Sequence, residues 1–139
     1  MSKIDDIINQ QVKEWISFAE SDLKFAQYGL DVEAEKAYRI VAYHAQQCAE
    51  KSLKAYLVYQ KIDFPYTHNI LQLLNVCGET ADWVSELQDA KNLTLYASTL
   101  RYPGQNIKVT EKEAIQAIEI AEHVCKVVKD ALIAKGLNL

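Results

Sequence analysis

The segment from Ala37 to Gln60 constrains the fold more strongly than any other part of the chain. Its sequence, AYRIVAYHAQQCAEKSLKAYLVYQ, contains neither Gly nor Pro and is rich in residues that favour helix. Small or apolar side chains recur along it at helical spacing, namely Val41, Ala45, Cys48, Ser52, Ala55 and Tyr59. The segment therefore predicts a long central helix with one face turned toward a core.

A polar strip lies beside this small-residue face. At about 100° per residue, four side chains fall together on the helical wheel: His44, Gln47, Lys51 and Lys54. A helix with a polar strip next to its buried face can hold a binding site, so these residues are the first candidates for function.

The preceding segment, Ile4 to Leu30, predicts another long helix. Its apolar residues return at spacings of three, four or seven, as expected for a helix that packs on one side. Gly29 suits the end of this helix, and Asp31 is the predicted N-cap of the central helix. The short connection predicts that the two helices run antiparallel.

After the central helix, Pro65 lacks an amide hydrogen and ends the helical pattern. Thr67 is the predicted N-cap of a short helix over residues 69–76, which Gly78 closes. A further helix is predicted from Ala81 to about Leu95.

The last helix carries the clearest start signal. Thr110 followed by Glu113 is a capping box, and an apolar stripe continues from there until Gly136. No segment shows the alternation of a strand. We therefore predict an all-α fold, an up-and-down antiparallel bundle of four long helices plus one short helix, in a single domain over residues 1–139.

Composition limits the functions that this chain can have. Its 15 Lys and Arg against 19 Asp and Glu give a formal charge of −4, so any contact with phosphate must be local. Cys48, Cys77 and Cys125 are odd in number and widely spaced, which predicts buried, reduced thiols. No apolar run is long enough to span a membrane, and the acidic N-terminus is unlike a signal peptide. We expect a cytoplasmic protein.

Several common kinds of site are missing from the sequence. His44, His68 and His123 do not have metal-ligand spacing, so no metal site is predicted, and His123 is interpreted as a packed or half-exposed residue. The chain has no phosphate loop, no dinucleotide fingerprint and no nucleophile elbow. We predict no cofactor.

What remains is a set of cations and hydrogen-bonding groups that suits an anion such as phosphate. The polar strip on the central helix would meet His68 and Arg101 if the bundle folds antiparallel. Structural interpretations stay open, since Glu50 and Lys54 also fit an ordinary surface pair four residues apart. His68 fits an exposed first-turn residue equally well, and Arg101 before the turn at Pro103 fits a solvated side chain.

Three motifs occur in order along the chain. The first is the string from His44 to Ala55, HAQQCAEKSLKA, preceded by the pair Asp22-Leu23 and by Ala26. The second is PYTH, which ends at His68, and the third is RYP, which begins at Arg101. With these motifs the chain resembles the HEPN domain family, the nucleotide-binding domain of higher eukaryotes and prokaryotes, in its branch with an Arg-Tyr-Pro motif. The likeness runs from about Trp15 to Leu132.

The resemblance implies an up-and-down bundle of four to five helices, in agreement with the helical pattern. It also implies a small prokaryotic, cytosolic domain that is often homodimeric and often paired with a minimal nucleotidyltransferase in toxin-antitoxin-like modules. On this interpretation the protein binds a nucleotide or RNA phosphate, or docks the partner protein. Its contact groups would be His44, Gln47, Lys51, Lys54, His68, Arg101 and Tyr102.

Several branches of the family are metal-independent ribonucleases. Their mark is an Arg that is followed directly by a polar residue and, four to six residues after the Arg, by a His. Here Arg101 is followed by YPGQNIK, which contains no His. Arg39 and His44 fit the gap, but the apolar Ile40 follows Arg39 and the pair lies in the central helix, so we interpret this match as coincidence.

The alternative function is therefore a metal-independent ribonuclease toxin whose site forms across a homodimer. In that case His44 or His68 would supply acid-base chemistry, while Arg101 and Lys51 would stabilise charge on phosphorus. A third interpretation takes the Arg-Tyr-Pro segment as a structural turn and dimer contact.

Overall fold

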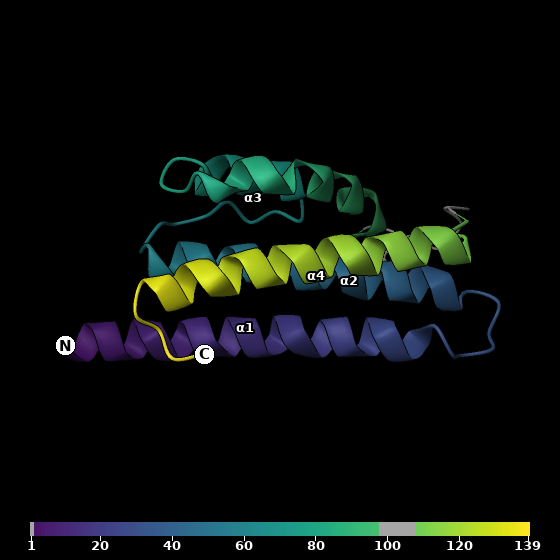
Figure 1. Ribbon diagram of the computed structural model, residues 1–139, viewed down its shortest axis with the longest axis horizontal. Helices are drawn as coiled ribbons and strands as arrows, with labels where there is room; N and C mark the ends of the chain where they lie inside the picture. The colour runs from purple at the N-terminus through teal and green to yellow at the C-terminus, as the bar shows by residue number, and fades with distance from the viewer. Residues whose placement is uncertain (1, 98–107) are drawn as a thin grey trace.

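The computed structural model describes residues 2–97 and 108–139, and all its regular elements are helical (Figure 1). This confirms the predicted all-α class. Arg101 and Tyr102 lie outside the described residues. The elements are α1 (Lys3–Gly29), α2 (Ala37–Tyr59), α3 (Ile70–Cys77), η1 (Trp83–Ala97) and α4 (Glu111–Ala134).

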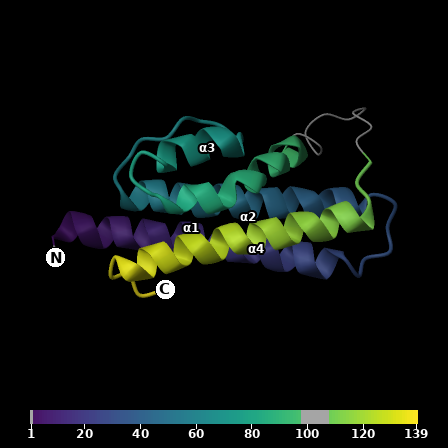
Figure 2. The ribbon, with the colours of Figure 1, turned by 45° about the horizontal axis from the view of Figure 1, so that its top comes forward.

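Helix α2 is the centre of the described fold. It contacts each of the other four elements, and 15 of its 23 residues are buried. Helices α1 and α4 lie along it, while α3 and η1 form a cover on the side away from α1 (Figures 1 and 2). The small residues of its predicted core face allow this close approach, since Ala45, Cys48 and Ala55 have no exposed surface.

The fourth predicted helix differs from expectation in its type. Trp83–Ala97 is a 3₁₀ helix with a kink at Leu87, where φ is −112° and ψ is 17°. The sequence contains the reason, because the buried residues of η1 recur every third position, which matches the 3.0 residues per turn of a 3₁₀ helix. This series is Val84, Leu87, Ala90, Leu93 and Tyr96, and Ala97 at the end of η1 is buried as well.

The predicted caps are only partly correct. Thr110 and Glu113 form the predicted capping box at the start of α4. In α3 the N-cap is Asn69, not Thr67; its side chain accepts a hydrogen bond from the Gln72 amide, and the Thr67 hydroxyl accepts one from the Asn69 amide. Asp31 does not cap α2 either, because that helix begins after Lys36 without a side-chain cap.

The three cysteines are free and buried, as predicted. Burial raises the pKa of the Cys77 thiol to about 12, which marks it as a packing residue. Within residues 2–97 and 108–139, no helix is long and apolar enough to cross a membrane. The same residues contain no group of three or more side chains that could hold a metal ion.

Candidate functional site

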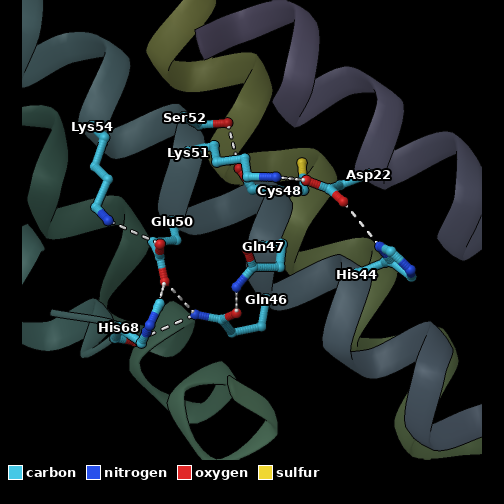
Figure 3. A network of polar contacts seen from close by, with 10 residues as sticks. All are labelled: Asp22, His44, Gln46, Gln47, Cys48, Glu50, Lys51, Ser52, Lys54 and His68. Atoms are coloured by element: carbon cyan, nitrogen blue, oxygen red, sulfur yellow. Dashed lines mark hydrogen bonds and ion pairs between the residues drawn. The ribbon is translucent and has the colours of Figure 1, made fainter. Parts of the chain in front are cut away.

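Asp22 of α1 joins two members of the predicted polar strip on α2 (Figure 3). One carboxylate oxygen lies 2.9 Å from Nδ1 of His44, and the other accepts a hydrogen bond of 2.6 Å from Nζ of Lys51. His44 and Lys51 are seven residues apart, so they lie on one face of the helix two turns from each other. Asp22 is buried, whereas His44 and Lys51 keep 29% and 24% of their side chains exposed.

The contact with Asp22 orients the His44 ring. A carboxylate oxygen accepts, so Nδ1 carries the hydrogen and Nε2 is the ring nitrogen left for another partner. The Phe25 ring stacks on His44 with centroids 5.8 Å apart, and Tyr43 meets it edge-on at 5.4 Å. Three neighbours thus hold a part-exposed imidazole in one position.

Glu50 organises a second cluster of polar side chains (Figure 3). Its carboxylate accepts hydrogen bonds from Nζ of Lys54 at 2.9 Å and from Nε2 of Gln46 at 3.0 Å, and it lies 2.7 Å from Nδ1 of His68. Only 4% of the Glu50 side chain is exposed. Burial alone would raise the pKa of Glu50, but the hydrogen bonds from Lys54, Gln46 and His68 outweigh it and lower the pKa.

Aromatic rings enclose the lysine of this second cluster. The Lys54 ammonium lies 5.5 Å from the centroid of the Phe64 ring and 5.9 Å from that of Trp15. The Lys51 ammonium has a similar neighbour, since the Phe18 ring centroid is 5.7 Å away. Rings at these distances attract a cation with their faces, so the two ammonium groups are held in place.

The structure places most of the predicted site residues together, though in two groups. His44 and Lys51 meet at Asp22, whereas Lys54 and His68 meet at Glu50. Gln47 is buried and donates to the side chain of Gln46. Arg101 and Tyr102 lie outside the described residues.

Neither organising carboxylate is among the site residues that the sequence predicts. The spacing of Glu50 and Lys54 allows a surface pair, but the structure corrects this, because only 4% and 11% of their side chains are exposed. A signal for Asp22 was available, since an acid at helical spacing between the core residues Ala19 and Ala26 needs a buried partner.

Chemically, each carboxylate balances one lysine and holds one histidine. The polar strip is therefore not a cluster of unpaired cations. Lys51 still has donors to offer, because an ammonium carries three hydrogens and Asp22 uses one. Together with Nε2 of His44, these donors can bind an anion or assist a proton transfer.

Comparisons with known proteins agree with the sequence motifs. The model of the HEPN domain matches residues 12–131. The crystal structure of TT1696 from Thermus thermophilus is similar over 86% of this chain and 97% of that one, with 28% identity and a TM-score of 0.75. ST0689, described as an archaeal HEPN homologue, is 28% identical over 86% of this chain and 96% of its own, with a TM-score of 0.67.

A search of curated proteins finds no match to this chain. The family match nevertheless covers most of the sequence, including α2, α3 and η1 entirely and most of α1 and α4. The chain belongs to the HEPN domain family.

Proposed function

We propose that this HEPN domain binds a nucleotide or the phosphate of single-stranded RNA at the α1–α2 face. The observation that supports this most directly is the joint contact of His44 and Lys51 with Asp22. The shared carboxylate fixes two part-exposed hydrogen-bonding groups on one helical face before any ligand arrives. Such preorganisation lowers the cost of ordering side chains when a ligand binds.

The pairing with Asp22 is compatible with phosphate binding. The remaining donors of Lys51 and the Nε2 atom of His44 can contact phosphate oxygens without breaking the existing bonds. The net charge of −4 gives little long-range attraction, so the interaction would be local and would weaken as salt is added. Arg101 and Tyr102 are proposed as further contact groups.

The proposal includes the partners that the family resemblance suggests. The domain would act as a homodimer in the cytoplasm of a prokaryote, together with a minimal nucleotidyltransferase in a toxin-antitoxin-like pair. The similarity to proteins from a bacterium and an archaeon supports the prokaryotic setting. In this role the domain presents RNA or itself to the partner and needs no catalytic base of its own.

The Asp22–His44 contact also supports a second candidate function, metal-independent RNA cleavage. A histidine whose Nδ1 is held by a carboxylate exposes Nε2 as a general base or acid. Cleavage would require this nitrogen to take the proton of a ribose 2′-hydroxyl as its oxygen attacks phosphorus. The bond from phosphorus to the 5′-oxygen would break in the same step, and the leaving oxygen would take a proton from water, which gives a 2′,3′-cyclic phosphate and a free 5′-hydroxyl. Lys51 would stabilise the negative charge that develops on the phosphate oxygens.

A single incubation separates these two functions. Labelled RNA of mixed sequence is mixed with the protein in EDTA, then examined on native and denaturing gels. We expect the RNA to be bound and to stay intact. Absence of a complex would overturn the binding function.

The His44→Ala variant decides the second function. His123→Ala is the matched control, because His123 is an exposed residue of α4 and is not among the histidines that contact Asp22 or Glu50. Cleavage by the wild type and His123→Ala, but not by His44→Ala, would identify a ribonuclease. Cleavage by all three proteins would exclude His44 as its acid or base.

A further inference from the structure

Helix α1 carries a second stripe of side chains, which faces away from the buried core of the bundle. Its positions are alternately three and four residues apart, and every one of them is exposed. The stripe contains Ile4, Ile7, Gln11, Glu14, Phe18, Ser21, Phe25 and Tyr28. This is the spacing of the a and d positions in a coiled coil, at which one helix packs along another.

The stripe is apolar at both ends and lies well away from the core face. Ile4, Ile7, Phe18, Phe25 and Tyr28 are 56–67% exposed. The core face of the same helix carries Val12, Ile16, Ala19 and Ala26, which are almost fully buried. Scattered apolar side chains are ordinary on a surface, but five in one line along a 27-residue helix indicate a contact surface.

The stripe is complementary to itself when two copies of α1 run antiparallel. Reversing one helix pairs each position with another position of the same stripe. The facing pairs are Ile4 with Tyr28, Ile7 with Phe25, Gln11 with Ser21 and Glu14 with Phe18. Apolar layers thus form at both ends, and a layer of two hydrogen-bonding side chains lies nearer the middle.

The charges on this face disfavour the parallel alternative. A parallel pair in register would place Glu14 against Glu14, and like charges at facing positions repel. In the antiparallel pair, Glu14 approaches Phe18 of the second copy. That ring is next to the Lys51 ammonium, 5.7 Å from its centroid, so the carboxylate would meet a cation.

The area of the stripe is sufficient for a dimer. A large aromatic side chain buries about 150–250 Å² when fully covered. Five large side chains that are more than half exposed would bury on the order of 600 Å² per copy, or about 1,200 Å² in total, which reaches the range of stable interfaces.

From this pattern we infer that two copies of the chain associate through the outward stripe of α1, antiparallel, with Ile7 of each copy facing Phe25 of the other. The inference rests on the homodimer in the proposed function and gives it a surface and a register. Because Phe25 stacks on His44 and Phe18 lies beside Lys51, the interface borders the candidate site in both copies.

Complementary charges test both the surface and the register. Ile7→Lys and Phe25→Glu each place one charge in the apolar layers, so each variant alone should sediment as a monomer of 15.8 kDa. In an equimolar mixture of the two variants, a dimer with one chain of each kind has one layer in which the new Lys faces the new Glu. Its other layer keeps Ile7 against Phe25. The mixture should therefore sediment at twice that mass, like the wild type.

A mixture of Ile7→Lys with Phe18→Glu is the control, because position 18 faces Glu14 in this register and the mixture should stay monomeric. Circular dichroism checks that every variant keeps its helix content, as expected for exposed positions. A monomeric wild type, dimeric single variants, or a first mixture that stays monomeric would each overturn the inference. These measurements contain no RNA, so their result is independent of the binding test.

Discussion

Replacement of Glu50 by Ala should lower the free energy of unfolding by about 3 kcal/mol, the largest effect expected from a single site residue. The substitution leaves the Lys54 ammonium without its carboxylate partner in surroundings where only 11% of the side chain is exposed. Breaking a buried ion pair from one side typically costs about 3–5 kcal/mol. We expect the lower end of that range because the lysine stem can extend its charge toward water.

Chemical denaturation measures this change, and Lys126→Ala is the control. Lys126 forms an ion pair with Asp130 at the same spacing of four residues and the same distance of 2.9 Å, but both side chains are exposed. Its loss should leave stability unchanged within measurement. If Glu50→Ala were as stable as this control, Glu50 would not be the anchor of the cluster.

The same carboxylate predicts a pH dependence. The pKa of Glu50 is lowered in the folded state from its ordinary value of 4.5, so its contribution to stability is complete above that value. The contribution is lost as pH falls through the lower, folded pKa. Denaturation curves of the wild type and Glu50→Gln should therefore converge at acid pH and separate above about pH 4.5.

Replacement of Asp22 by Ala should be the next largest change. It removes a charged carboxylate that accepts two hydrogen bonds, one from the Lys51 ammonium and one from the His44 ring. Each such bond contributes about 1.5–3 kcal/mol, but Lys51 and His44 are partly exposed and regain water. We therefore expect a loss of about 2 kcal/mol in the free energy of unfolding, measured by denaturation.

Glu20→Ala is the matched control, because Glu20 is an acid of the same helix that pairs with Lys129 at 3.0 Å in an exposed position. The free energy of unfolding of Asp22→Asn should lie between those of Asp22→Ala and Glu20→Ala. The Asn amide has one oxygen that can accept a hydrogen bond, whereas the carboxylate has two. Equal stability of Asp22→Ala and Glu20→Ala would show that the shared carboxylate is not needed to hold the two α2 side chains.

Much of the fold followed from local signals in the sequence. Helices α1, α2 and α4 have long apolar periodicities and lack breakers, so the predicted ends agree within a residue or two. The caps were harder to predict because neighbouring polar residues compete for nearby amides, as Thr67 and Asn69 do. The type of η1 was missed because an apolar residue every third position also fits a wider α-helical pattern.

The candidate site was only half predictable. The wheel placed His44 and Lys51 on one face, but it contained no information about which residue of another helix would face them. Asp22 reaches them through the packing of α1 on α2, which depends on the crossing of the two helices and not on local spacing. The pairing of Glu50 with Lys54 could be predicted, because both residues lie on the same helix. The enclosure of Lys54 could not, because the rings beside it, Trp15 and Phe64, come from other segments.

In the proposed function, Lys51 is held by Asp22 and contacts RNA phosphate. The most direct test is the equilibrium affinity for a labelled single-stranded RNA, measured for the wild type, Lys51→Ala and Lys126→Ala. Both variants lose one positive charge, but only Lys51 lies at the site. We expect Lys51→Ala to bind more than about tenfold more weakly and Lys126→Ala to bind like the wild type. Equal affinities for all three proteins would show that Lys51 does not contact the RNA.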